Sequence, residues 1–477
     1  MAAVAGWERA CGMGKIMTWC AGLALVVAVA GCGRPPAAAA GRAAGSWGRA
    51  TRVPGLTALD KDRTADVLSV SCAAAGSCAA GGTYHVPGGG YEGFVADERN
   101  GRWGRAIAVP GLAALNTGGQ AAVLSVSCSA AGDCAAGGSY AGRPHSQSAF
   151  AVVERNGVWG QAARLRAQEV SSVSCAPAGY CAVGGYFIRH LTMAGFVATE
   201  RNGTWSQAAG VPGRAALNKG NADVVTMSCA AAGDCAAGGY YSDRNGYFSQ
   251  AFVATERNGR WGTATPVPGL AALNKGSADA GVTSVSCGAA GSCAAVGSYS
   301  DRLGDHVFVA DERNGRWGTA AGLGAPNKAE SVANSVSCSA AGSCTVGGTF
   351  AGQAFVATER NGRWGTATGL PGLAALNKGG NAYVTTVSCA SPGNCAVGGD
   401  YSPNSFRLQG FVATERNGVW GTAIQVPGLA ALDKGGNARV LSISCAPAGT
   451  CAAGGYYTVR SQSGPLHEFV ATDKNSH

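Results

Sequence analysis

The chain has 477 residues, of which 46% are hydrophobic and 13% are charged, and its formal net charge is +9. This composition provides enough apolar side chains for a folded core. The positive excess is modest for a chain of this length, so the sequence does not indicate a nucleic-acid partner.

Residues 1–31 have the pattern of a targeting segment. Basic residues precede an apolar run over residues 16–30, which is too short to span a bilayer. The run leads into Val-Ala-Gly-Cys, which resembles a bacterial lipobox, the signal for lipid attachment to Cys32. We therefore expect a lipid-anchored protein on the extracellular face of the bacterial cell membrane. The alternatives are an ordinary secretion signal, which would give a secreted protein, and an uncleaved anchor.

Residues 32–46 contain a Pro-Pro pair among Ala, Gly and Arg, with no apolar periodicity. This composition indicates a flexible tether. We expect the folded domain to occupy residues 47–477 and to stand off the membrane surface.

The folded domain contains eight copies of one cassette, each marked by two cysteines with five residues between them. The pairs are Cys72 with Cys78, Cys128 with Cys134, Cys175 with Cys181, Cys229 with Cys235, Cys287 with Cys293, Cys338 with Cys344, Cys389 with Cys395, and Cys445 with Cys451. Export places these thiols where disulfides persist, and cysteines facing each other across a hairpin lie within disulfide reach. Two thiolates per copy with no paired His or further Cys do not make a tetrahedral metal site. We expect one disulfide hairpin per copy, no metal and no cofactor.

Each cassette predicts four short β-strands. The first is Val-x-Ser-Val-Ser-Cys, and the second ends in Gly-Gly in seven copies, with Val296-Gly297 as the exception. A phenylalanine opens the third strand in every copy, and Asn-Gly-x-Trp follows in seven. Asn-Gly is a strong hairpin signal because a type I′ turn needs positive φ at both central residues. Repeats 47–58 residues long predict an all-β, eight-bladed β-propeller of four-stranded blades.

The two ends of the domain are complementary. The eighth copy ends at His477, before its Gly-x-Trp strand, whereas Gly45-Ser46-Trp47-Gly48 matches that missing piece at the other end. A linear stack has no reason to begin and end inside a unit. We therefore predict a closed ring in which the N-terminal strand completes the last blade.

Gly-Gly at the end of a second strand, a following Tyr and a Trp on the fourth strand resemble the kelch type of propeller blade over roughly residues 45–477. The tyrosines are Tyr84, Tyr140, Tyr186, Tyr240, Tyr299, Tyr401 and Tyr456, and Phe350 stands in the sixth copy. Kelch blades do not need the cysteine pair. The resemblance implies a fold and leaves the function open.

Residues that recur in every blade are expected to have structural roles. Glu98, Glu154, Glu200, Glu256, Glu312, Glu359 and Glu415, with Asp473 in the eighth copy, occupy one blade position. An active site does not need eight copies of one group, so we expect a repeated charge pair or turn hydrogen bond. We likewise assign the repeated tryptophans to packing between blades.

Function is expected where the copies differ. In an up-and-down blade, the turns between strands one and two and between strands three and four lie on one face of the ring. We call this the constant face, because those turns are short and uniform. The loops between strands two and three, and the crossings to the next blade, lie on the other face, which we call the variable face.

The crossings place a set of lysines on the variable face. Those that we select as ligand-binding candidates are Lys219, Lys275, Lys378 and Lys434, with Lys61 and Lys328 at related positions. They would attract an anionic partner by their field, and the alternative is that they only solvate the crossings.

Single histidines and acids occur in the loops of the variable face. They are His85, His145, His190, His306 and His467, and Glu92, Asp243, Asp301, Asp305 and Glu468. Most such residues are solvated, but a hydrolase or lyase would need some of them to converge. No recognised catalytic spacing is present.

The first hypothesis is a monomeric surface lipoprotein whose propeller binds an anionic cell-envelope polymer, a glycan or a protein on the variable face. The alternatives are an extracellular hydrolase or lyase at the mouth of the propeller, and a structural spacer.

Overall fold

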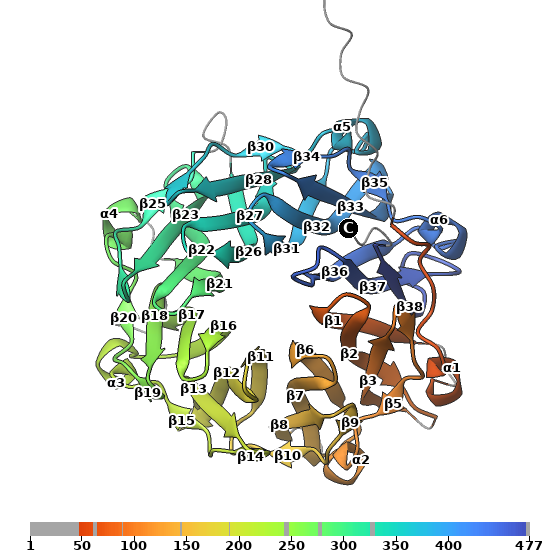
Figure 1. The fold of residues 1–477 in the computed structure, drawn as a ribbon, viewed down its shortest axis with the longest axis horizontal. Coiled ribbons are helices and arrows are strands. Elements are labelled where there is room, and N and C mark those ends of the chain that lie inside the picture. Colours follow the sequence, from red (N-terminus) through yellow and green to blue (C-terminus); the bar gives the residue numbers. More distant parts are fainter. Residues whose placement is uncertain are drawn as a thin grey trace, which may run out of the picture. The chain divides into compact units, whose positions relative to one another are not determined.

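The computed structural model describes residues 47–60, 64–87, 89–143, 146–189, 191–242, 248–274, 279–324 and 330–473. Cys32, the targeting segment, the tether, Lys61, Lys275 and Lys328 lie outside these residues, as do His145, His190 and Asp243. The described residues form an eight-bladed ring (Figure 1), which confirms the predicted fold.

Among the described residues, no helix is long and apolar enough to cross a membrane.

The first strand of each blade lies at the inner edge of the ring (Figure 1). These strands are β1 (Ala65–Ala74), β6 (Ala121–Ala130), β11 (Glu169–Ala176), β16 (Ala222–Ala231), β21 (Ala280–Ala289), β26 (Ser331–Ala340), β31 (Ala382–Ser391) and β36 (Ala438–Cys445).

The second strand of each blade pairs antiparallel with the first, and the third strand pairs antiparallel with the second. The second strands are β2 (Ser77–His85), β7 (Asp133–Arg143), β12 (Tyr180–Arg189), β17 (Asp234–Ser242), β22 (Ser292–Asp301), β27 (Ser343–Phe350), β32 (Asn394–Asn404) and β37 (Cys451–Thr458). The third strands are β3 (Tyr91–Arg99), β8 (Ser146–Arg155), β13 (Thr192–Arg201), β18 (Ser249–Arg257), β23 (Gly304–Arg313), β28 (Gln353–Arg360), β33 (Arg407–Arg416) and β38 (Leu466–Thr472).

The fourth strand is split into two short pieces, both paired with the third strand. The pieces are β4 (Arg102–Trp103) and β5 (Ile107–Ala108), β9 (Val158–Trp159) and β10 (Ala163–Arg164), β14 (Thr204–Trp205) and β15 (Ala209–Gly210), β19 (Arg260–Trp261) and β20 (Thr265–Pro266), β24 (Arg316–Trp317) and β25 (Ala321–Gly322), β29 (Arg363–Trp364) and β30 (Thr368–Gly369), and β34 (Val419–Trp420) and β35 (Ile424–Gln425).

Six four-residue helices lie in the described crossings at the outer rim (Figure 1). They are α1 (Leu56–Leu59), α2 (Leu112–Leu115), α3 (Arg214–Leu217), α4 (Leu270–Leu273), α5 (Leu373–Leu376) and α6 (Leu429–Leu432). A Pro-Gly pair precedes each one, and the glycine takes a positive φ, as at Gly55 with φ 77°. Where the helix begins with leucine, that leucine is buried, as Leu56 is.

The N-terminal residues close the ring as predicted. Thr51 and Val470 exchange two backbone hydrogen bonds of 2.9 Å, and Trp47 forms a bridge with Asp473. Residues 47–51 therefore supply the outer strand of blade 8, which β36, β37 and β38 leave incomplete.

The cysteine prediction is confirmed in every blade. The disulfides join Cys72 to Cys78, Cys128 to Cys134, Cys175 to Cys181, Cys229 to Cys235, Cys287 to Cys293, Cys338 to Cys344, Cys389 to Cys395, and Cys445 to Cys451. In each pair the Cα atoms are 3.9–4.0 Å apart. The bonds join the first and second strands near the constant face. Each closes a small loop and stabilises the fold by about 2 kcal/mol in the chain-entropy account.

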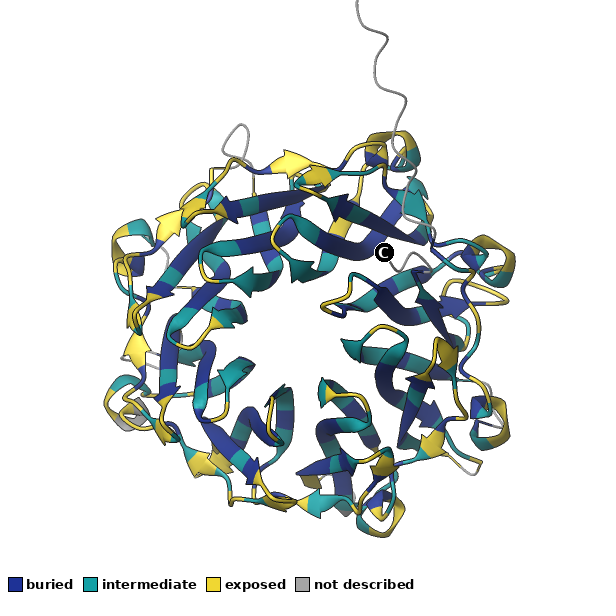
Figure 2. Ribbon diagram, viewed as in Figure 1, coloured by how far each residue is buried: buried dark blue, intermediate teal, exposed yellow. Residues whose placement is uncertain are grey.

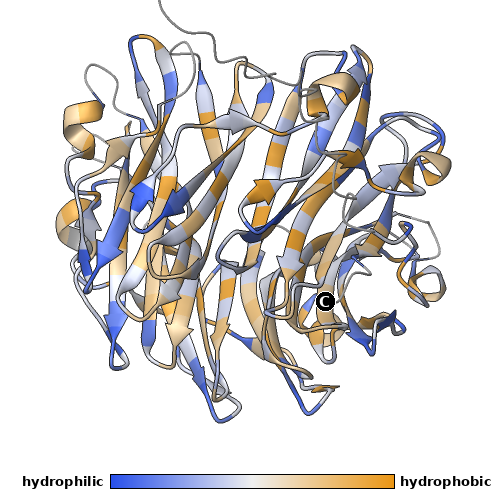
Figure 3. Ribbon diagram, turned by 45° about the horizontal axis from the view of Figure 1, so that its top comes forward, coloured by the Kyte–Doolittle hydropathy of each residue, from blue (hydrophilic) through white to orange (hydrophobic). Residues whose placement is uncertain are grey.

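The core lies between blades. The described buried apolar residues form eight clusters, and each cluster joins two neighbouring blades, including blade 8 with blade 1. Buried residues fill the middle strands of each blade while exposed residues occupy the outer rim (Figure 2). Apolar segments alternate with more polar ones along the strands of the ring (Figure 3). The eight clusters between blades therefore hold the ring together.

Close contacts explain why each blade has glycine at both positions of the Gly-Gly pair. A Cβ on the first glycine, Gly81, would lie 2.5 Å from Cγ1 of Val123 in the next blade. A Cβ on the second, Gly82, would lie 1.9 Å from the carbonyl oxygen of Asp66, where β1 bulges. The first glycine thus admits the valine of the next blade.

Blade 5 is the one blade without the Gly-Gly pair, and a smaller residue in blade 6 compensates for the difference. Val296 replaces the first glycine in blade 5, and Ala333 replaces the facing valine in blade 6. Both side chains are fully buried in the same cluster. At the other boundaries the small residue is on the earlier blade and the large residue is on the later one. At this boundary the large residue, Val296, is on the earlier blade and the small residue, Ala333, is on the later one.

This exchange predicts a specific coupling. Ala333→Val should overpack against Val296 and lower the free energy of unfolding by about 1–3 kcal/mol, whereas Val296→Gly with Ala333→Val should recover most of the loss. Chemical denaturation of both variants measures this, and a double variant at least as unstable as Ala333→Val alone would contradict it.

Candidate ligand-binding site

Backbone contacts confirm the assignment of turns to the two faces. Gly101 donates its N–H to the carbonyl of Gly76 at 3.0 Å, so the two short turns of blade 1 lie side by side. On the other side, Gly118 in a crossing donates to the carbonyl of Ala141 at 2.7 Å. The loops between second and third strands therefore share the variable face with the crossings.

The described lysine candidates are not gathered at one place. Lys219, Lys378 and Lys434 are exposed, and each lies just after a short helix at the outer rim. They belong to three separated crossings, between blades 3 and 4, 6 and 7, and 7 and 8. Their role as ligand contacts stays a prediction.

The described loop histidines each have a neighbour within their own blade. His85 packs edge-on against Tyr91, and His467 stacks on Tyr457 with ring centres 5.4 Å apart. His306 lies 2.9 Å from Asp301.

The described loop acids are likewise engaged. Glu468 is buried and forms a two-hydrogen-bond ion pair with Arg52 at 2.9–3.0 Å. Asn116 donates to Glu92 at 3.0 Å, and Ser300 donates to Asp305 at 2.6 Å. Among the described residues, no cluster of three or more His, Cys, Asp or Glu could hold a metal ion.

The repeated acids sit between blades. Each is buried, and an arginine of the preceding blade approaches most of them, as Arg155 approaches Glu200 at 2.8 Å. Several of the repeated tryptophans reach back in the other direction, as Trp317 does when it donates its indole N–H to Thr255 of blade 4 at 3.0 Å. The indole N–H groups of Trp205 and Trp261 have no such partner among the described residues. The two contacts latch neighbouring blades from both sides.

Two boundaries use other partners for this latch. Glu98 of blade 1 accepts from the hydroxyl of Thr472 in blade 8 at 2.8 Å. In blade 3, Tyr180 places its hydroxyl 2.7 Å from both carboxylate oxygens of Glu256 in blade 4, and Arg201 instead stacks over the ring of Tyr180. A hydroxyl there takes the place of the guanidinium.

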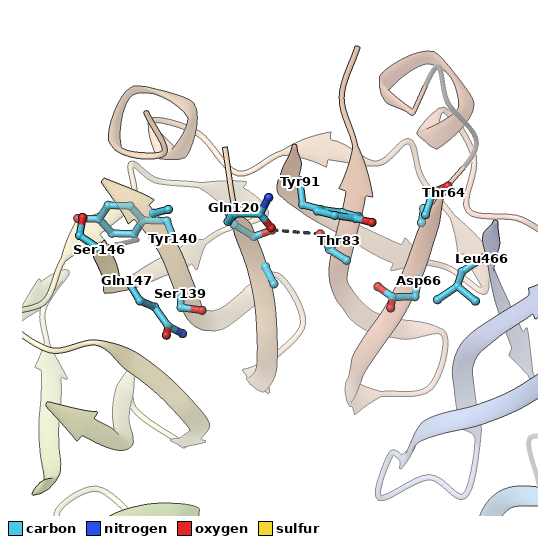
Figure 4. A pocket seen from close by; sticks show the side chains of 14 residues that line it. Thr64, Asp66, Thr83, Tyr91, Gln120, Ser139, Tyr140, Ser146, Gln147 and Leu466 are labelled. Carbon is cyan, nitrogen blue, oxygen red and sulfur yellow. Dashed lines mark hydrogen bonds between the residues drawn. The ribbon is translucent and has the colours of Figure 1, made fainter. Parts of the chain in front are cut away.

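A candidate site is a groove of about 640 Å³ over blades 1 and 2, which Leu466 of blade 8 also lines (Figure 4). Its residues come from the ends of β1, β2, β3, β6, β7 and β8 that lie on the variable face. The polar lining consists of Thr64, Asp66, Thr83, Tyr91, Gln120, Ser139, Tyr140, Ser146 and Gln147. None of these residues was among the ligand contacts predicted from the sequence.

Small residues in blade 2 contribute to the groove. Ala122 faces Ser139 across β6 and β7. In blade 3 the same pair is Glu169 and Tyr186, and in blade 4 it is Asp223 and Tyr240. A signal was present in the sequence: this position, directly before the valine of the first strand, differs from blade to blade.

Hydroxyls and amides dominate the polar part of the groove. Thr83 donates its hydroxyl to the carbonyl of Ala121 at 3.0 Å, which joins blade 1 to blade 2 (Figure 4). Gln147 is held in place because its amide donates to Glu169 at 2.7 Å and its carbonyl accepts from Tyr186 at 3.3 Å.

Asp66 is the one acid in the described groove lining. Burial raises the pKa of Asp66 to about 6. This carboxyl is mostly ionised at pH 7, so the described lining of the groove carries one negative charge and no positive charge.

A close pair of carboxylates lies beside the groove. Burial, with the nearby Glu169, raises the pKa of Asp223 to about 7. A hydrolase needs two carboxylates that converge on the substrate, and neither Asp223 nor Glu169 lines the groove.

No protein-family model and no curated protein matches this chain. Solved structures match its fold. Sqt1 from Chaetomium thermophilum superposes with a TM-score of 0.53 at 13% identity, over 89% of this chain and 98% of that one. Its complex with the N-terminus of the ribosomal protein L10 gives 0.48 at 12% identity, over 83% and 95%.

Two further matches are weaker. The WD40 repeats of RRP9 give a TM-score of 0.45 at 8% identity, over 90% of this chain and 99% of that one. The GH74 xyloglucanase from Xanthomonas campestris gives 0.45 at 12% identity, over 86% of this chain and 59% of that one. The likeness to Sqt1, at a TM-score of 0.53, supports the fold alone, and the kelch type stays a prediction.

The latch between blades 1 and 2 generates a pH prediction. Burial and the neighbouring Asp97 raise the pKa of Glu154 to about 8. Glu154 has a pKa near 4.5 in the unfolded chain. Between pH 4.5 and about pH 8, Glu154 is therefore protonated in the folded protein but ionised in the unfolded chain. The free energy of unfolding should fall as the pH rises through this range. Asp97→Thr, which introduces the residue of blades 3 and 4, should therefore raise the melting temperature more at pH 8 than at pH 5. An equal change at both pH values would contradict this assignment.

Proposed function

We propose that this protein is a cell-surface binding module that holds a neutral glycan in the groove of blades 1 and 2. The observation that carries the proposal is the groove itself: a hollow lined by hydroxyls, amides and two tyrosines, Tyr91 and Tyr140, on the face where the blades differ. Hydroxyl and amide groups both donate and accept hydrogen bonds, as sugar hydroxyls do. Tyr91 offers an amphipathic ring for packing against a sugar.

The charge of the groove favours a neutral ligand over an anionic polymer. Its described lining contains no lysine or arginine and one carboxylate, Asp66. An anionic chain would meet that carboxylate without a compensating cation. The exposed lysines at the outer rim are the feature that an anionic partner would use instead.

The targeting segment supports a location for this activity. We propose that the mature protein is a monomer, lipid-anchored through Cys32 on the extracellular face of the cell membrane, with residues 32–46 as its tether. Light scattering of the purified protein tests the monomeric state.

The groove is tested by filling it with residues that the fold already uses. Ala122→Glu with Ser139→Tyr reproduces the pair of blade 3 and should abolish binding on an array of neutral oligosaccharides. The melting temperature should change little. The matched control is Gly281→Glu with Ser298→Tyr in blade 5, because a Cβ at Gly281 would make only ordinary contact, 3.8 Å from Tyr240. The control should bind as the wild type does.

Two results would contradict the groove assignment: equal binding by the filled variant and the wild type, or binding of acidic polymers alone. In the second case, a variant with Lys219, Lys378 and Lys434 changed to Glu would show whether the lysines of the outer rim bind the polymer.

The anchor is tested separately. Cys32→Ala removes the sulfur to which the lipid would be attached, so most of the protein should move from the membrane fraction to the soluble fraction. Retention of the variant in the membrane fraction would contradict lipid attachment at Cys32.

A further inference from the structure

Three hairpins on the variable face reach the same height above the ring. In blades 3, 5 and 7 the third strand begins at Thr192, Gly304 and Arg407. Each start lies four residues before the repeated phenylalanine of its blade, Phe196, Phe308 or Phe411. A strand rises about 3.3 Å per residue, so the three turns stand level.

The residue directly before each of these third strands is apolar and exposed. Leu191, Leu303 and Phe406 retain 97%, 66% and 81% of their accessible surface. These three occupy equivalent positions in their blades, and Phe248, directly before β18 in blade 4, is also exposed, at 48%. We call them the apolar tips.

Leu191 is held in an unfavourable backbone conformation. Its φ is 66°, in the left-handed region that favours glycine or asparagine. Glycine or asparagine would form this turn with less strain, so the turn itself does not require leucine at position 191.

An exposed arginine accompanies each apolar tip. Arg189 lies two residues before Leu191, Arg302 directly precedes Leu303, and Arg407 directly follows Phe406. Blade 8 repeats the combination in the connection after β37, where Val459 and Arg460 are both exposed. Arginine beside a protruding apolar group suits the boundary between lipid headgroups and acyl chains, where the guanidinium meets phosphate.

The spacing of the tips favours a flat, deformable surface over a protein partner. The core of a protein interface is a contiguous apolar patch, whereas these tips stand on the turns of separate blades, each with its own arginine. A bilayer accepts separated apolar side chains, because each can enter the interface independently.

We propose that the three apolar tips and their arginines dock the variable face onto an anionic lipid bilayer. This proposal is independent of the glycan groove. The groove lies on the same face, over blades 1 and 2, so docking would bring it close to the membrane surface.

The test is co-sedimentation of the full chain carrying Cys32→Ala with vesicles of phosphatidylcholine containing about one-third phosphatidylglycerol. Replacing Leu191, Leu303 and Phe406 with serine should weaken partitioning at least tenfold. The targeting segment is identical in both proteins, so its contribution cancels. Pure phosphatidylcholine, or high salt, should weaken binding of the parent protein because the arginines lose their anionic partners or are screened.

The matched control lies on the opposite face. Val158 and Val419 are 70% and 69% exposed beside the Asn-Gly turns of the constant face. Their replacement with serine should leave partitioning unchanged. The proposal is overturned if the tip variant binds vesicles as well as its parent does, if the control variant loses as much, or if the parent does not bind anionic vesicles at all. The fold of every variant is checked by its melting temperature.

Discussion

The ring depends on hydrogen bonds that side chains make across the blade boundaries. Neighbouring first strands do not pair as sheets, so backbone N–H groups there need another partner. The two hydroxyl residues of each first strand supply it: Ser69 and Ser71 accept from the N–H groups of Val126 and Cys128 at 2.9 Å. The pattern recurs at every boundary, including blade 8 to blade 1, where Ser442 and Ser444 accept from Val70 and Cys72.

This arrangement gives sixteen such bonds, two at each of the eight boundaries. Each stabilises the ring by about 1 kcal/mol. Together with the glycine–valine packing and the latches of the repeated acids, they explain why the middle and the constant end of each blade repeat so closely. The variable end takes no part in these contacts, so its residues are free to differ and to carry the proposed groove and apolar tips.

Much of the ring could be predicted from the sequence because its contacts repeat. The cysteine pairs, the eight blades and closure by Trp47 follow from a spacing that recurs from copy to copy. The glutamates also behave as their repetition indicates, though only the structure shows that most of them face an arginine of the preceding blade.

The groove could not be predicted in the same way. It depends on small side chains at Ala122 and Ser139, and on their position against Thr83 and Tyr91 of another blade, which no local pattern records. The lysines were selected because they repeat along the crossings, yet those that the structure describes lie apart at the outer rim. The structure therefore moves the candidate site from the repeated lysines to the groove over blades 1 and 2, whose described lining contains one acid.

The central claim is that the constant parts of the blades build the ring and that the variable face of blades 1 and 2 binds a glycan. Hydrogen–deuterium exchange of the whole protein, with and without an oligosaccharide selected on the array, tests it most directly. The account predicts slower exchange in residues 83–91, 120–122 and 139–147, with no change at the Asn-Gly turns. Protection confined to the constant face, or spread evenly over all eight blades, would contradict it.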